Sequence, residues 1–140
     1  MKKVVDIEKD RAEFAYKKVE EIADEKYNKT LYTDVKKEEY KSYVKKIPTM
    51  IQTNGISATF AFMFSKKKTY KIIYDQINEW LQKRNLKKEE ELVKWIIGLD
   101  SSMYKYVSVE ILYLLNWMRR FAEGMIRKEN NGKEKEKTTS

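Results

Sequence analysis

The sequence predicts an all-α fold, a compact bundle of about six helices, one of them kinked or broken at a proline. Charged residues make up 37% of the 140 residues, and the chain has only four glycines and one proline. Apolar residues recur every three or four positions, and no strand-like alternation persists beyond a few residues. We expect one helical domain over residues 1–127. A disordered, charged tail is expected over residues 128–140, which contain no apolar residue.

The first two helices are expected over residues 5–28 and from Asp34 onward, joined by a polar link over residues 29–33. The stripe of the first helix comprises Ala12, Ala15 (or Phe14), Val19, Ile22 and Ala23. The stripe of the second helix comprises Tyr40, Val44, Ile47 and Ile51. Pro48 falls inside this second stripe, where its ring clashes with the preceding turn. We therefore expect a kink there or a break near Lys46.

Asn54-Gly55 is the sharpest stop signal in the chain, because both residues tolerate positive φ. A short, very apolar helix is expected over residues 56–64, in the middle of the bundle or under a partner. The uncharged run over residues 47–65 is about long enough to cross a bilayer. Polar residues and Pro48 interrupt this run. We expect two short buried helices and no membrane span.

Three further helices are expected, over residues 69–83, over residues 88–99 and from Asp100 onward. Thr69 is the candidate N-cap of the first of these, and Asn85-Leu86 separates it from the next. The expected buried residues are Ile72, Ile73, Ile77, Trp80 and Leu81, then Leu92, Val93 (or Trp95), Ile96 and Leu99. The last helix has the most regular stripe, formed by Tyr104, Val107, Ile111, Leu114, Met118, Phe121 and Met125.

The chain contains neither histidine nor cysteine. Ser–His–Asp catalysis, thiol chemistry and the commonest metal sites are therefore excluded. We assign no catalytic residue, metal ligand or cofactor, and we expect a cytoplasmic protein. An enzyme that uses carboxylates would need a cleft that holds two of Glu110, Glu123 and Asp75. The run Glu89-Glu90-Glu91 favours a helix N-terminus rather than a metal site, because adjacent helical residues point to different faces.

The net charge of +8 is concentrated between Tyr40 and Tyr74. This lysine window contains no acidic residue and seven lysines, namely Lys41, Lys45, Lys46, Lys66, Lys67, Lys68 and Lys71. The other 23 basic residues nearly balance the 22 acidic residues. Each lysine alone is equally well explained as solubilising surface. The absence of acids from the whole window instead favours one cationic strip that binds a polyanion.

Two further groups of residues are candidates for contacts with a polyanion. Gln52 and Asn54 lie in a polar turn before a helix N-terminus, where backbone N–H groups can hold phosphate. A simple helix-breaking turn explains the same residues. Arg119 and Arg120 suit phosphate through their planar guanidinium groups. Their position near the C-terminus of a helix is also favoured by the helix dipole.

Two long motifs resemble a known family, the small helical subunit of type III-B (Cmr) CRISPR effector complexes. The first motif covers residues 40–56 and continues over residues 59–62, where a basic helix with Ile47-Pro48 leads to Gln52-Thr53-Asn54-Gly55 and a small apolar helix. The second covers residues 110–124, from Glu110 through Trp117 and Arg119 to Gly124. Arg11-Ala12 and Ala15 match the opening helix more weakly.

The resemblance implies a non-catalytic, all-α subunit that stacks in several copies beside guide RNA and other Cmr subunits and helps to hold target RNA. Among the candidate residues it covers Lys45, Lys46, Gln52, Asn54, Arg119 and Arg120. The corner Lys66-Lys67-Lys68 rests on charge alone. The alternative is a structural interaction module whose lysine window docks an acidic partner protein instead of RNA. Charge reversal at Lys45 and Lys46 distinguishes the two.

Overall fold

The computed structural model describes residues 4–24 and 36–127. Within these ranges there are five helices and no strand: α1 (Val4–Ala23), α3 (Lys37–Ser65), α4 (Thr69–Lys83), α5 (Leu92–Ile97) and α6 (Ser101–Met125). The all-α prediction is confirmed. About six helices were expected, and five are found because the apolar helix over residues 56–64 continues α3. The expected end of the first helix, the polar link, Asp34 and the charged tail lie outside the described residues.

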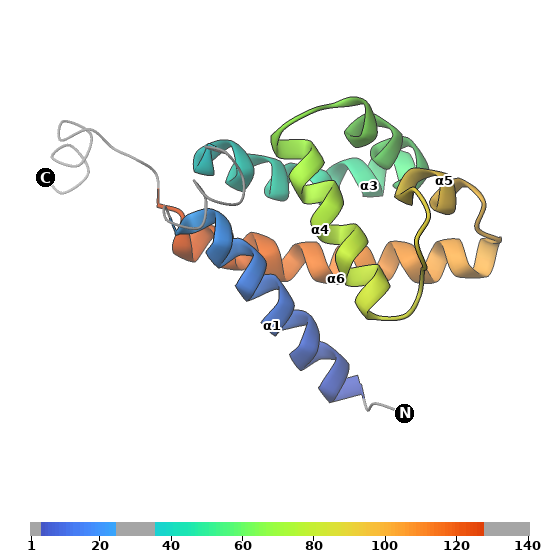
Figure 1. Ribbon diagram of the computed structural model, residues 1–140, viewed down its shortest axis with the longest axis horizontal. Helices are drawn as coiled ribbons and strands as arrows, with labels where there is room; N and C mark the ends of the chain where they lie inside the picture. The colour runs from blue at the N-terminus through green and yellow to red at the C-terminus, as the bar shows by residue number, and fades with distance from the viewer. Residues whose placement is uncertain (1–3, 25–35, 128–140) are drawn as a thin grey trace, which may run out of the picture.

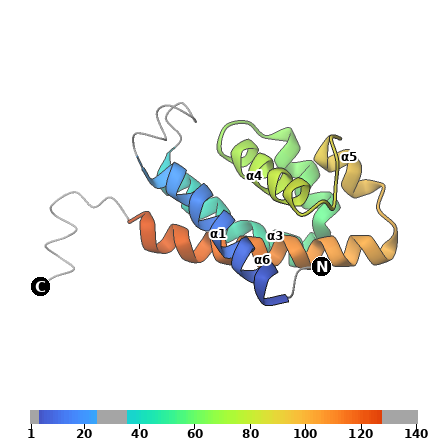
Figure 2. The same cartoon turned by 60° about the horizontal axis from the view of Figure 1, so that its bottom comes forward.

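Helix α6 runs along the length of the molecule, and α1 crosses it (Figures 1 and 2). Helix α6 packs against α1 and α3, and α3 in turn packs against α4 and α5. The stripe predicted for α6 is buried at its centre, through Val107, Ile111, Leu114 and Met118. From α1, Phe14, Ala15, Val19 and Ile22 enter the same core. No helix in the described ranges is long and apolar enough to cross a membrane.

Helix α3 departs from helical dihedral angles only at Gly55. Of the two alternatives expected at Pro48, a kink or a break near Lys46, the break is not found, because the helix continues through Pro48. Ile47 and Ile51 on either side are buried, and their packing requires continued helical spacing. Gly55 has φ 85° and ψ 166°, in a region that side chains disfavour. The predicted stop at Asn54-Gly55 is therefore a kink within α3.

Two helix starts differ from the prediction. Thr69 does not cap α4: the N-cap residue is Lys68, at φ 61°, and the Thr69 hydroxyl donates to Glu39 Oε1 at 2.6 Å. Helix α5 begins at Leu92 rather than at residue 88. The buried Lys87 ammonium donates to the carbonyls of Lys88 and Glu90 and holds that segment as a loop.

The start of α6 agrees with the prediction. Asp100 is the N-cap, and its carboxylate accepts a hydrogen bond from the Met103 backbone N–H at 2.8 Å. Such a cap satisfies one of the N–H groups that a helix leaves unpaired at its first turn.

Candidate nucleic-acid interface

Three aromatic rings form a row across α3 and α4. Tyr43 stacks on Tyr70, with ring centroids 3.9 Å apart and planes 6° apart. Phe62 meets Tyr70 edge to face, with centroids 5.2 Å apart. Tyr43 precedes the kink in α3, Phe62 follows it, and Tyr70 lies in the first turn of α4. The aromatic row therefore brings together both parts of α3 and the start of α4.

A lysine lies at each end of the aromatic row. Lys46 Nζ is 5.9 Å from the centroid of the Tyr43 ring, and Lys66 Nζ is 5.1 Å from that of Phe62. Both distances allow a cation–π attraction. The row thus joins two parts of the lysine window that are far apart in sequence. It also restricts where their ammonium groups can lie.

Five lysines of the window are exposed and have no carboxylate partner among the described residues. They are Lys45, Lys46, Lys66, Lys67 and Lys68. All come from α3 or from the turn into α4, and two of them, Lys46 and Lys66, lie against the aromatic row. Unpaired ammonium groups at a surface keep their full charge available to a polyanion. We call these five residues the open lysines.

The other two lysines of the window are engaged within the fold. Lys71 forms an exposed ion pair with Asp75 at 2.8 Å, one turn along α4. Lys41 is partly buried, and its Nζ donates to the carbonyl of Ile126 at 2.9 Å. That carbonyl follows the C-terminus of α6, where a cation is favoured by the helix dipole. The strip of seven expected lysines is therefore reduced to the five open lysines.

Gln52 and Asn54 are exposed just before the kink. The N–H groups after the kink are only partly available, because the Ser57 N–H donates to the Tyr104 hydroxyl of α6 at 3.2 Å. Hydrogen bonding from the Ser57 side chain, together with that from the Ser57 backbone N–H, lowers the pKa of Tyr104 below its ordinary value. The turn is thus fixed against α6, and a phosphate would have to bind backbone N–H groups near the kink other than that of Ser57.

Arg119 and Arg120 lie near the end of α6, and no contact joins them to the aromatic row. Arg119 Nη2 donates to Asn116 Oδ1 at 3.0 Å, and its Nη1 lies 3.6 Å from Glu123 Oε1. Arg120 is exposed and has no partner among the described residues. Local contacts along the helix therefore account for Arg119, and Arg120 remains available.

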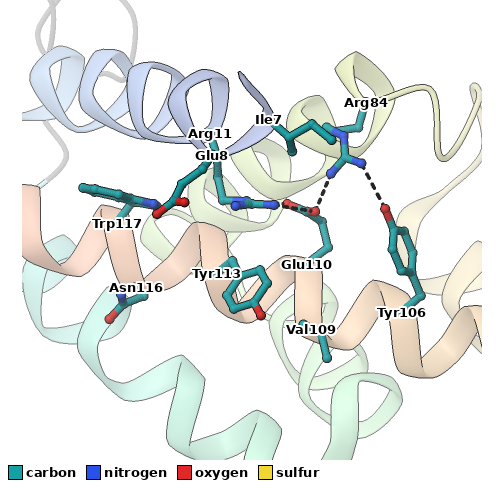
Figure 3. Close-up of a pocket in the computed structure, with 10 residues that line it drawn as sticks. All are labelled: Ile7, Glu8, Arg11, Arg84, Tyr106, Val109, Glu110, Tyr113, Asn116 and Trp117. Atoms are coloured by element: carbon teal, nitrogen blue, oxygen red, sulfur yellow. Dashed lines mark hydrogen bonds and ion pairs between the residues drawn. The ribbon is translucent and has the colours of Figure 1, made fainter. Parts of the chain in front are cut away.

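Sequence reasoning missed a buried ionic cluster around Glu110. Arg11 donates from Nε to Oε2 of this carboxylate at 2.7 Å and from Nη2 to Oε1 at 2.9 Å. Trp80 Nε1 donates to Oε2 at 2.9 Å, and Arg84 Nη1 bonds to Oε1. Figure 3 shows the two guanidinium groups meeting the carboxylate from α1 and from the end of α4. The one available signal was a glutamate inside the apolar stripe of α6.

The ion pairs determine the pKa of Glu110. Burial would raise this pKa, but hydrogen bonds from Arg11 and Trp80 and the charges of Arg11 and Arg84 lower it below the ordinary 4.5. The other two carboxylates considered for catalysis lie elsewhere. Asp75 pairs with Lys71 and Glu123 lies beside Arg119. Of the three, only Glu110 lines the pocket drawn in Figure 3.

The fold and surface define a class of protein: a small all-helical protein, without histidine, that presents a cluster of open lysines. The family model for CRISPR-associated protein (Cas_Cmr5) matches residues 7–125. The chain therefore belongs to the Cmr5 family of CRISPR-associated proteins, and the resemblance to the small subunit of the type III-B (Cmr) complex is confirmed.

A solved structure shares the fold. The crystal structure of a CRISPR-associated Cmr5 family protein from Thermus thermophilus superposes with a TM-score of 0.68 at 24% sequence identity. The match covers 85% of this chain and 99% of the Thermus chain. At this identity the likeness supports the helical architecture and carries no residue roles.

Proposed function

We propose that this protein is a non-catalytic, cytoplasmic subunit of a type III-B CRISPR ribonucleoprotein effector. Several copies stack within the complex, beside other Cmr subunits, and help to hold the guide and target RNA. Family membership supports the association with a Cmr complex. The stacking is what the resemblance to the family implies, and the RNA contact is inferred from the chemistry of the surface.

The open lysines carry the RNA proposal. Five exposed ammonium groups on α3 and on the turn into α4 have no carboxylate partner among the described residues, and two of them, those of Lys46 and Lys66, lie over rings of the aromatic row. Phosphate contacts release counterions, so binding of this kind is sensitive to salt and largely independent of sequence. Gln52 and Asn54 are exposed on α3 and supply hydrogen-bonding groups to sugar or base edges.

A single copy has few cationic contacts, so its intrinsic affinity for RNA is low. Copies that stack along one strand convert later binding events into intramolecular ones. The same modest contacts then hold the strand firmly. In this account the protein contributes charge and position, and other subunits supply the chemistry.

Charge reversal within a reconstituted complex tests the proposal. The double variant Lys45→Glu and Lys46→Glu changes two exposed side chains that have no carboxylate partner among the described residues. We expect the complex to assemble with the full set of subunits and to retain less RNA. Failure of assembly would instead favour the alternative function, docking of the lysines on an acidic partner protein.

A further inference from the structure

A pocket of about 500 Å³ lies between α1 and α6 and is bounded at one end by Arg84, just after α4 (Figure 3). Its walls come mainly from the first half of α1 and the middle of α6. The open lysines lie instead on α3 and on the turn into α4, and no lysine lines the pocket. The pocket is therefore a surface of different chemistry from the proposed RNA interface.

The pocket contains two guanidinium groups that share one carboxylate. Arg11 and Arg84 both bond to Glu110, whose side chain is only 4% exposed. One carboxylate balances only one of the two cations. Glu8 lines the same pocket but forms no ion pair with either arginine, so only one carboxylate bonds to the two cations, and a buried cation in that state favours a further hydrogen-bonded anion.

Hydrogen-bond donors remain available in this cluster. Each guanidinium group has five N–H groups. Arg11 uses two of them on Glu110, and Arg84 uses one on Glu110 and one on the Tyr106 hydroxyl. Tyr106 accepts in that bond, so its own O–H remains a donor. The pocket is thus rich in donors that suit a carboxylate.

The pocket has an exposed and mainly aromatic edge on α6. Tyr106, Val109 and Tyr113 follow each other on one stripe of α6 and are 46%, 41% and 55% exposed. Tyrosine, tryptophan and arginine are the residues that dominate the energetics of protein–protein interfaces. An exposed tyrosine stripe beside largely buried arginines is typical of a surface that a protein partner covers.

We propose that this pocket docks an acidic segment of a partner protein. The carboxylate of an aspartate or glutamate reaches Arg11 and Arg84, and an adjacent apolar side chain covers Val109 and Tyr113. Glu8 also lines the pocket, is exposed, and has no ion pair among the described residues. Its charge repels the incoming carboxylate and keeps the affinity low.

Binding of short peptides to the full chain tests this proposal without RNA. The probe is an N-acetylated, C-amidated tripeptide of leucine, aspartate and phenylalanine. The control peptide has asparagine in place of aspartate. Nuclear magnetic resonance titration of backbone amides gives both the affinity and the residues affected. We expect the acidic peptide to bind more tightly and to shift resonances of pocket residues on α1 and α6.

Three variants sharpen the test while leaving both arginines in place. Glu8→Gln removes the repulsion and should raise the affinity for the acidic peptide about threefold at low salt. Val109→Glu adds a negative charge at the exposed edge of the pocket and should lower the affinity for the acidic peptide by a similar factor. Ile97→Glu is the matched control: Ile97 lies on α5, is 66% exposed and does not line the pocket. The Ile97→Glu variant should bind the acidic peptide with the affinity of the wild type.

Three results would overturn the proposal. The first is equal binding, or none, of the acidic and neutral peptides by the wild-type chain and by Glu8→Gln. The second is weaker binding of the acidic peptide after Glu8→Gln, which would show that the charge of Glu8 does not repel it. The third is displacement of the acidic peptide from these residues by a ten-nucleotide RNA, which would assign the pocket to phosphate. None of these results bears on the RNA contact of the open lysines.

Discussion

The rings of Tyr43 and Tyr70 lie 3.9 Å apart and nearly parallel, which joins the first half of α3 to the first turn of α4. Lys46 packs over the outer ring of this pair, and Phe62 contacts the other from beyond the kink. Two of the open lysines, Lys46 and Lys66, therefore lie over rings that an aromatic contact between the two helices holds together.

Replacing Tyr43 should weaken RNA binding without changing net charge. In Tyr43→Leu, Lys46 loses the ring over which it packs, and an exposed cation–π contact contributes about 0.5–1 kcal/mol. We expect the affinity for single-stranded RNA to fall about two- to fivefold. Filter binding at fixed salt measures this change. Tyr16→Leu is the control, because Tyr16 is exposed and contacts Phe121 but no lysine. Equal effects of the two substitutions would contradict the role of the row.

Lys41 and Lys45 should separate stability from binding. Lys41→Met removes the ammonium group that bonds to the Ile126 carbonyl, and we expect a loss of about 1–2 kcal/mol in the free energy of unfolding. Lys45→Met removes an exposed group with no carboxylate partner among the described residues and should leave stability nearly unchanged. Urea titration followed by circular dichroism compares the two. A Lys41→Met protein as stable as the wild type would show that the hydrogen bond from Lys41 to the Ile126 carbonyl is dispensable.

Acid should destabilise the fold through Glu110. Its pKa is below 4.5 in the folded protein, so the folded state favours the ionised carboxylate. This contribution to stability is fully present above the unfolded pKa and is lost as the pH falls from about 4.5 through the folded pKa. Urea titrations from pH 6 to pH 3 measure the loss.

In Glu110→Gln, two guanidinium groups lose their carboxylate, and we expect about 3–5 kcal/mol of destabilisation at pH 7. The acid-dependent part of the profile should then be smaller than in the wild type. Glu123→Gln alters a half-exposed carboxylate 3.6 Å from Arg119 and should change stability by less than about 1 kcal/mol. Identical pH profiles for the wild type and Glu110→Gln would refute the claim that Glu110 causes the loss of stability in acid.

Gly55 should resist substitution at the kink. A Cβ at this position would lie 2.9 Å from the Tyr104 hydroxyl, at a φ of 85° that side chains rarely adopt. We expect Gly55→Ala to cost about 1–3 kcal/mol. In a Tyr104→Phe background the cost should fall but not vanish, because the backbone strain remains. Gly124→Ala, where the added Cβ meets nothing within 4 Å, should not destabilise the protein. Thermal unfolding of these variants and of the wild type measures the changes in stability.

Local patterns were sufficient to predict most helices. The stripe of α6, its start at Asp100 and the interruption at Asn54-Gly55 are all encoded within a few residues of sequence. The loop before α5 was not predictable in this way. Lys87 is buried there because backbone carbonyls surround its ammonium group, and that geometry exists only in the folded chain. Likewise, tertiary packing of Ile47 and Ile51 keeps α3 helical through Pro48.

The lysine window was visible in the sequence, but the state of each lysine was not. Lys41 and Ile126 are 85 residues apart, and Arg11 and Glu110 are 99 apart. Such pairs depend on how α1, α3 and α6 pack, which a single sequence does not specify. The same limit explains why the Glu110 cluster and its pocket were missed.

Salt dependence of RNA binding tests the central claim, that the open lysines contact phosphate, most directly. The comparison is between the wild-type chain and the triple variant Lys66→Gln, Lys67→Gln and Lys68→Gln, with Lys71→Gln as the ion-paired control. If each corner lysine contacts one phosphate, the slope of log affinity against log salt becomes shallower by about 2 in the triple variant and changes little in the control. Wild-type affinity that does not decrease between low and moderate salt, or a triple variant with the wild-type slope, would contradict the account.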